Sequence, residues 1–143
     1  MKPLLSLILL LTVSFVLPNA IRAQSRPAAD TSYNEDYDKT FTKVEVEAAF
    51  PGGSAAWLNF LNTHLVYPKK AVSKKIEGVV VVQFIVDYEG NVTSFVALTG
   101  DPILQEAALK AMKQSPNWIP ATQNGRKVRS YKKQPIVFKL QAN

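Results

Sequence analysis

The sequence predicts an α+β fold in which a small antiparallel β-sheet packs against two helices. Three observations lead to this prediction. Residues 78–98 have the pattern of a β-hairpin, residues 55–65 and 103–114 each carry an apolar stripe with helical spacing, and the chain closes on a further extended segment, 128–140. A helix with one apolar face must bury that face, and the hairpin offers the surface for it.

The hairpin is the clearest part of the pattern. Residues 79–86 are rich in β-branched side chains, which suit a pleated sheet. The stretch 87–91 then breaks the run, and Gly90 can take the positive φ that a short hairpin loop requires. Residues 92–98 alternate again, so we expect Val92, Val96 and Leu98 on one face and Thr93 and Thr99 on the other.

Both faces of the first hairpin strand are apolar. One face is expected to meet the helices, and it carries Val80, Val82, Phe84 and Val86. The opposite face needs another cover, either residues 44–48 or a second chain, and it carries Val79, Val81 and Ile85. A homodimer is therefore one possibility that the sequence leaves open.

Residues 1–23 have the features of an export signal. Lys2 precedes an apolar run of 14 residues, 4–17, and Pro18 ends the run before the small residues around Ala23. A membrane-spanning helix needs about 20 apolar residues, so a cleaved signal peptide is favoured, with an uncleaved membrane anchor as the alternative. Residues 24–40 are polar without periodicity and predict a flexible linker. Residues 41–143 are left as the folded domain.

Before the hairpin, the pattern predicts a short strand and two helical segments. Residues 41–48 alternate between apolar and charged side chains, as in a strand. Ser54 is a good N-cap for a helix that ends before Pro68. The face expected to pack on the sheet carries Trp57, Leu58, Leu61 and Leu65. Residues 69–75 predict another turn or two, with Ala71, Val72 and Ile76 directed inward.

After the hairpin, Asp101-Pro102 is a strong helix start, and Ser115-Pro116 ends that helix. Its buried stripe is predicted to carry Leu104, Ala107, Ala108, Ala111 and Met112. Asn124-Gly125 predicts a tight turn. Pro135 cannot donate to a β-ladder, so the last strand, or its beginning, is expected at an edge of the sheet.

The charge is uneven along the chain. Residues 66–143 hold 12 Lys/Arg against 5 Asp/Glu, whereas residues 24–65 hold 3 against 6. A basic domain suits nucleic acid, an anionic membrane surface or an acidic peptide, although a solvated surface is the simpler explanation. The absence of cysteine excludes a disulfide framework, cysteine-ligated zinc and a thiol nucleophile. His64 is the single histidine, so neither a metal site nor a cofactor is expected.

No catalytic constellation is recognisable. The sequence has no phosphate-binding glycine loop, no Gly-x-Ser-x-Gly elbow and no His-Glu-x-x-His motif. Asp87 and Glu89 are turn residues, and the adjacent Ser73 and Lys74 do not share a helix face. The only interleaving of aromatic and basic residues is Tyr131-Lys132-Lys133, too little for nucleic-acid binding. We therefore predict a non-catalytic protein that binds no nucleic acid.

Several short motifs, in order and at suitable spacing over about residues 50–140, resemble the C-terminal domain of the TonB family. They are Tyr67-Pro68-Lys69-Lys70-Ala71, Gly78 with Val80-Val81-Val82-Gln83-Phe84, Asp87, Gly90-Asn91-Val92, Ala107-Ala108, Trp118-Ile119-Pro120-Ala121, Asn124-Gly125 and Pro135-Ile136-Val137-Phe138-Lys139-Leu140. The upstream Phe50-Pro51-Gly52-Gly53 resembles the form of the domain that occurs with many outer-membrane nutrient receptors.

The resemblance implies the same α+β fold and a periplasmic module that contacts TonB-dependent outer-membrane transporters. In the family, the transporter's N-terminal Ton box adds as a strand to the edge of the sheet. Carried over, the partner-binding edge is the closing strand, with Ile136, Val137, Phe138, Lys139 and Leu140. The segment before Tyr67-Pro68, which lies near the same contact in the family, corresponds here to Leu65 and Val66.

The alternative function within the same family is that of an energy transducer, which couples the inner-membrane proton-motive force to outer-membrane nutrient transport. Such a protein keeps its anchor helix, pairs with a proton-motive complex and crosses the periplasm on a long Pro-rich spacer. Here the linker of 17 residues, 24–40, extends to only about 60 Å. The sequence therefore favours a periplasmic binding module for a transporter or another envelope protein.

Overall fold

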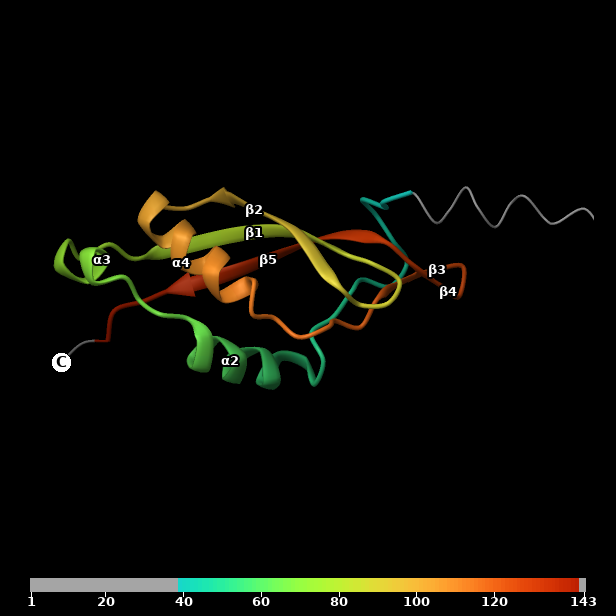
Figure 1. Cartoon of the computed structure of the whole chain (residues 1–143), viewed down its shortest axis with the longest axis horizontal. Coiled ribbons are helices and arrows are strands. Elements are labelled where there is room, and N and C mark those ends of the chain that lie inside the picture. The colour runs from blue at the N-terminus through green and yellow to red at the C-terminus, as the bar shows by residue number, and fades with distance from the viewer. Residues whose placement is uncertain (1–38, 142–143) are drawn as a thin grey trace, which may run out of the picture. The chain divides into compact units, whose positions relative to one another are not determined.

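The computed structural model describes residues 39–141. Its sheet has three antiparallel strands in the order β2-β1-β5, with β1 (Gly78–Val86) between β2 (Val92–Thr99) and β5 (Ser130–Phe138) (Figure 1). Three helices accompany it: α2 (Gly53–His64), α3 (Lys69–Ser73) and α4 (Pro102–Met112). A small hairpin of β3 (Ala121–Gln123) and β4 (Arg126–Val128) completes the fold. The predicted α+β arrangement is confirmed.

The predicted signal peptide, 1–23, and all but the last two residues of the predicted linker, 24–40, lie outside the described residues. Among residues 39–141, no helix has the length and apolarity that a membrane crossing requires.

The β1–β2 turn is built on Asp87 and Gly90. The Asp87 Oδ1 atom accepts hydrogen bonds from the backbone N–H of Glu89 at 2.9 Å and of Asn91 at 2.8 Å. Gly90 has φ 91°, and a Cβ placed on it lies only 2.2 Å from the carbonyl oxygen of Trp118. The predicted hairpin and its need for glycine are confirmed, and the close approach to Trp118 adds a second reason for that glycine.

Strand β2 does not alternate as its sequence predicts. Val92 lies opposite the buried Val86, whereas Val96 lies opposite Gln83 on the other face of the sheet. Two register shifts separate these pairs, and Ser94 has a left-handed φ of 57° within the strand. The prediction that Val92 and Val96 share a face is therefore wrong, because irregular pairing in β2 breaks the period of two.

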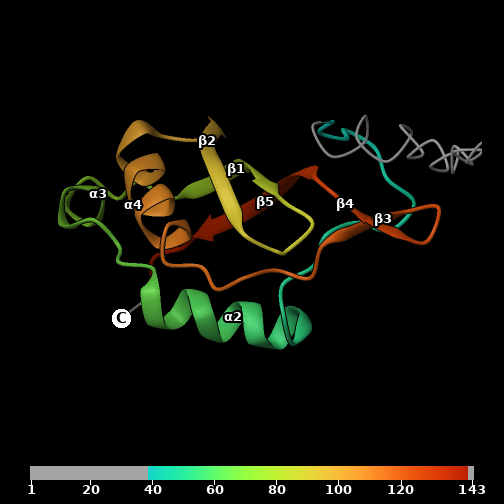
Figure 2. The same ribbon diagram turned by 45° about the vertical axis from the view of Figure 1, so that its right-hand side comes forward.

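The core lies between one face of β1 and helix α4. Val80, Val82, Phe84 and Val86 are fully buried, as predicted. Asp101 caps α4 by accepting a hydrogen bond from the Ile103 N–H at 2.8 Å, with Pro102 as the first helical residue. The predicted stripe of α4 is buried at Leu104, Ala108, Ala111 and Met112, and Ala107 is half-buried. Figure 2 shows α4 beside the strands and α2 below them, under β5.

Residues 41–48 do not form the predicted strand. They make isolated bridges instead: Phe41 pairs with Ser130, and Val46 with Thr122. Within this segment Ala48 is buried, whereas Val46 is 58% exposed. On the outer face of β1, Ile85 is buried, while Val79 is 46% exposed.

Helix α2 is held mainly by aromatic packing. Of its predicted stripe, Trp57 is buried, and Leu61 and Leu65 are half-buried against the core. Trp57 and Phe60 are its buried residues, and both rings contact Phe50 at centroid distances of 5.3 and 5.4 Å. Trp57 also lies 6.0 Å from Trp118, which in turn contacts Phe84 of β1.

Three expectations for the helices before the hairpin are corrected by this packing. Leu58 is 58% exposed on α2 rather than packed on the sheet, and Val72 is 47% exposed on α3 rather than directed inward. The start of α2 is Gly53, preceded by Gly52 at φ 84°, so Ser54 is not its N-cap.

Candidate functional site

Strand β5 offers a free backbone edge. The register of β5 against β1 is continuous from Ser130 to Phe138. The Tyr131 N–H donates to the Phe41 carbonyl at 2.9 Å, away from β1. Since backbone groups in an antiparallel ladder alternate between the two sides of a strand, Lys133, Pro135 and Val137 also turn theirs away from β1. Within residues 39–141, no further backbone hydrogen bond reaches this edge.

This alternation explains why a proline is tolerated in the middle of β5. Pro135 lies opposite Val81 in the ladder, but its nitrogen faces outward, so no β1–β5 hydrogen bond is lost. The free edge therefore carries two N–H groups, from Lys133 and Val137, and three carbonyl groups. The prediction that Pro135 marks a sheet edge agrees with the strand order β2-β1-β5.

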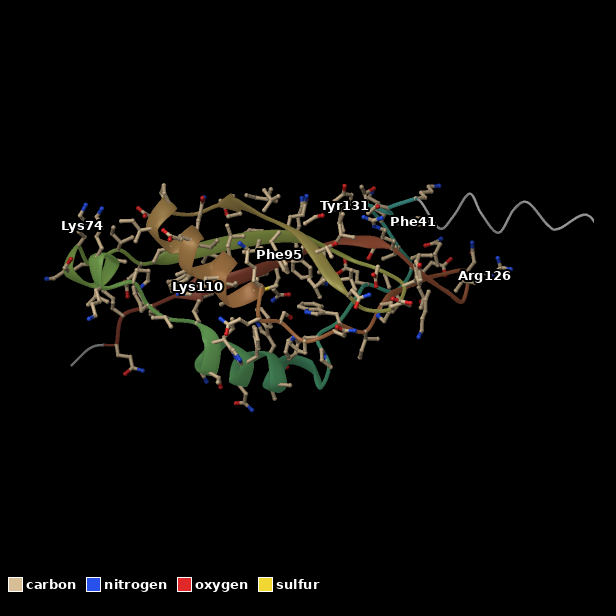
Figure 3. The ribbon with its side chains drawn as sticks, viewed as in Figure 1. Phe41, Lys74, Phe95, Lys110, Arg126 and Tyr131 are labelled. Carbon is tan, nitrogen blue, oxygen red and sulfur yellow. The ribbon has the colours of Figure 1, made fainter. Side chains whose placement is uncertain are left out.

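The start of the free edge is closed by another part of the chain. At its start, Phe41 runs parallel to β5 (Figure 3). The Phe41 carbonyl accepts a hydrogen bond from the Tyr131 N–H, and the Phe41 N–H donates one to the Arg129 carbonyl. Beyond the end of β5 at Phe138, the Leu140 N–H donates to the carboxylate of Glu77, the residue before β1, so this bond lies on the β1 side and not on the free edge. About five residues, 133–137, remain open to another strand, and Phe41 shows that this edge accepts main-chain pairing.

A groove of about 500 Å³ lies beside the free edge, between β5 and helix α2. Leu58 and Leu61 of α2 lie on one side and Pro135 and Val137 of β5 on the other. The full lining is Trp57, Leu58, Leu61, Asn62, Leu65, Tyr67, Val72, Pro135, Val137, Lys139, Leu140 and Gln141. This combination of an apolar groove and an unpaired edge suits an extended peptide.

Tyr67 is part of the lining of the groove and is held in place by two contacts. Its hydroxyl donates to the Ile76 carbonyl at 2.6 Å, and its ring stands edge-on to Phe138 at 5.5 Å. Burial, together with the nearby Glu77 carboxylate, raises the pKa of Tyr67 above its usual value. Lys139 is the single charged side chain in the lining of the groove.

The sequence-predicted binding residues fall into two groups. Leu65, Val137, Lys139 and Leu140 line the groove, and Val66 is 69% exposed outside its lining. By contrast, Ile136 and Phe138 are buried in the core, and their backbone groups face β1. Lys139 and Leu140 follow the end of β5 at Phe138 rather than belonging to it.

Sequence reasoning missed the wall formed by α2. Leu58 and Val72 line the groove, but they were expected to face the sheet or the core; Leu61 packs against the core as expected and lines the groove as well. One signal was present, because residues 57–61 hold four large apolar side chains in five positions, too many for a helix with one narrow apolar face.

A second, smaller hollow of about 390 Å³ lies between residues 42–47 and the start of β5, lined by Thr42, Glu47, Gln83, Tyr131, Lys132 and Lys133. Glu47 and Lys132 form an ion pair there, and the hydrogen bond and charge of Lys132 lower the pKa of Glu47.

The single histidine, His64, packs in α2, where its ring stacks on Phe60 at 4.5 Å. In residues 39–141, no group of three or more His, Asp and Glu side chains is placed to hold a metal ion.

Comparison with known proteins identifies the family. A profile of the family "Gram-negative bacterial TonB protein C-terminal" matches residues 63–140, more than half of the chain. The chain belongs to the TonB C-terminal family. The match confirms the resemblance seen in the sequence motifs. It begins near the end of α2, so Trp57, Leu58 and Leu61 lie before it.

Two NMR solution structures of the Helicobacter pylori TonB C-terminal domain are similar to this TonB C-terminal domain. One is 28% identical, with 65% of this chain and 89% of that chain covered and a TM-score of 0.46. The other is 27% identical, with 62% and 95% covered and the same TM-score of 0.46. No curated protein matches the chain.

TonB C-terminal domains are non-catalytic and associated with transport, and the family interacts with outer-membrane transporters. TonB family proteins belong to the cell envelope.

Proposed function

We propose that this protein is a periplasmic TonB-like module that binds the N-terminal Ton box of an outer-membrane transporter, or a similar segment of another envelope protein, by strand addition to β5. The observation that carries the proposal is the unpaired edge at Lys133, Pro135 and Val137. A strand added there regains hydrogen bonds along its backbone, whatever its side chains are.

The edge of β5 suits this role better than the edge of β2. Strand β5 keeps a continuous register over nine residues, whereas β2 contains two register shifts. Irregular pairing of this kind discourages the addition of another strand. The five free backbone groups of β5 each contribute about 0.5–1.5 kcal/mol net when a partner pairs with them.

Hydrogen exchange of single amides tests the binding mode directly. The probe is a synthetic peptide from the N-terminus of a TonB-dependent transporter, added to the full chain. We expect the Lys133 and Val137 amides to exchange fast in the free protein and at least about tenfold more slowly with peptide, since both point outward. The Gln134 and Ile136 amides, which face β1, serve as internal controls and stay protected throughout.

The variant Val137→Pro tests the same edge by affinity. It removes one outward N–H and, as Pro135 shows, leaves the β1 ladder intact, so we expect about fivefold weaker peptide binding. Val137→Ala is the matched control, because it shortens the side chain but keeps the N–H. Phe138→Pro is unsuitable, since its N–H faces β1. Peptide binding that leaves the Lys133 and Val137 amides unprotected and is indifferent to Val137→Pro would rule out strand addition to β5.

A further inference from the structure

We infer that helix α2 reads the side chains of the bound strand, so that the partner segment carries an apolar residue facing α2 and an acidic residue near Lys139. The inference rests on the proposed strand addition to β5, and it adds to the site a helix that precedes the family match at residue 63. The juxtaposition behind it is the apolar groove between α2 and the free edge of β5.

Exposed apolar side chains from three separate elements converge on this groove. Leu58 of α2 is 58% exposed, Val72 of α3 is 47% exposed and Val137 of β5 is 62% exposed, and all three are in its lining. None of them is needed for the core, which is made by other residues of the same elements, such as Trp57, Phe60 and Ala71. Large apolar side chains left exposed around one groove are typical of a binding surface.

The aromatic cluster fixes α2 beside β5 before any partner arrives. Phe60 stacks on Trp57 at 5.7 Å, and Phe50 stands edge-on to Trp118 at 5.5 Å. A wall held in place in this way need not be ordered on binding, which reduces the entropic cost of recognition. Side chains of an added strand alternate between its two faces, so one set projects to the α2 side of the edge.

The charge of the groove selects for an acidic partner. Lys139 is the one charged residue of the lining, and it follows directly after β5. Glu77 accepts the Leu140 N–H and is not in the lining of the groove. Residues 66–143 as a whole carry a net positive charge. A carboxylate on the partner is therefore attracted both locally and by the domain.

Two pairs of variants of the full chain test the inference with the transporter-derived peptide. Leu58→Ala is expected to weaken binding about tenfold, because it removes apolar contact from the groove wall. Leu98→Ala is the matched control, since Leu98 is 44% exposed but lies outside the groove. Lys139→Glu is expected to weaken an Asp-containing peptide about tenfold more than its Asn counterpart. Lys110→Glu, on α4, is the charge control (Figure 3).

The outcomes separate the two proposals. If peptide protects the Lys133 and Val137 amides but Leu58→Ala and Lys139→Glu bind like the unaltered chain, α2 has no reading role and strand addition stands. If no peptide protects these amides, both proposals fail. If the groove instead holds a second copy of the chain, sedimentation shows self-association that Leu58→Ala abolishes, and the inference is overturned. Thermal melting of Leu58→Ala checks that the fold is kept, and Leu58→Met, which retains the apolar bulk, must restore binding.

Discussion

Replacing Gly90 by alanine tests how the β1–β2 turn is tied to the aromatic cluster. Gly90 has φ 91°, a conformation that costs an L-residue about 1–2 kcal/mol. The added Cβ would lie 2.2 Å from the Trp118 carbonyl oxygen, which belongs to the backbone and cannot simply rotate away. The two segments must therefore separate.

Separation breaks the hydrogen bond from the Trp118 N–H to the Gly90 carbonyl, now 2.8 Å long, and this loss contributes about 1 kcal/mol. It also shifts Trp118, whose ring lies 4.9 Å from that of Phe84 in the core. Displacing a well-packed core side chain costs about 1–3 kcal/mol. We therefore expect Gly90→Ala to lower the free energy of unfolding by about 3–6 kcal/mol in total.

The assay is urea unfolding followed by tryptophan fluorescence, which reports on Trp57 and Trp118 within one cluster. Gly125→Ala is the matched control: its φ is 71°, but an added Cβ meets no atom within 4 Å, so only the backbone cost of about 1 kcal/mol applies. If the two variants differ by less than about 0.5 kcal/mol, the steric account of Gly90 is wrong.

Two further predictions concern acid stability and export. Partial burial acts to raise the pKa of Asp87, but hydrogen bonds from Asn91, Glu89 and Gly90 outweigh it and hold that pKa below its usual value of 3.8. A carboxyl with a lowered folded pKa stabilises the fold above the unfolded value and loses this effect as the pH falls through the folded one. Asp87→Asn should thus cost about 1–2 kcal/mol at pH 7 and progressively less below about pH 4, measured by urea unfolding across pH; an equal cost at pH 2.5 would contradict this. Separately, N-terminal sequencing of the exported protein should give a start near Gln24, whereas a start at Met1 would favour the anchored energy transducer.

Local signals were sufficient for strand β1, for the turn after it and for α4. Asp101 and Pro102 determine where α4 begins. The Asp101 carboxylate accepts a hydrogen bond from the Ile103 N–H, and Pro102 is the first helical residue, so both signals lie within residues 101–103. The burial of Val80 and Phe84 follows from a period of two along β1, which has no irregularity against β5. In these elements the tertiary structure agrees with what each segment prefers on its own.

Elements whose contacts are remote in sequence were predicted poorly. Helix α2 turns Phe60 inward because Phe50 and Trp57 form an aromatic cluster with Trp118, about 60 residues away, and no helical periodicity could reveal that partner. Residues 41–48 have the alternation of a strand, yet they make only two isolated bridges, to Ser130 and to Thr122, and build no ladder. In β2, Ser94 has a φ of 57°, and the register of the strand shifts. A serine in the sequence does not predict such a bulge, as a glycine would.

The candidate site was predicted as an edge but not as a groove. Pro135 indicates an edge strand by its missing N–H alone, whereas the groove depends on where α2 lies, and α2 is held by the aromatic cluster. Within β5, Ile136 and Phe138 are core residues and Val137 faces outward, because side chains alternate along a strand with continuous register.

The edge of β5 has a passive explanation that must be weighed against the binding one. Proline and lysine on an edge strand are common defences against unwanted pairing, and Pro135 and Lys133 fit that description. If Pro135 and Lys133 served only to prevent pairing, however, exposed apolar residues beside the edge would counteract them, because such residues promote association. Leu58 and Val137 remain more than half exposed on either side of the groove. Selective strand addition requires both features. The unpaired backbone of β5 can pair with any strand, and the contacts of side chains with the apolar groove determine which strand binds tightly.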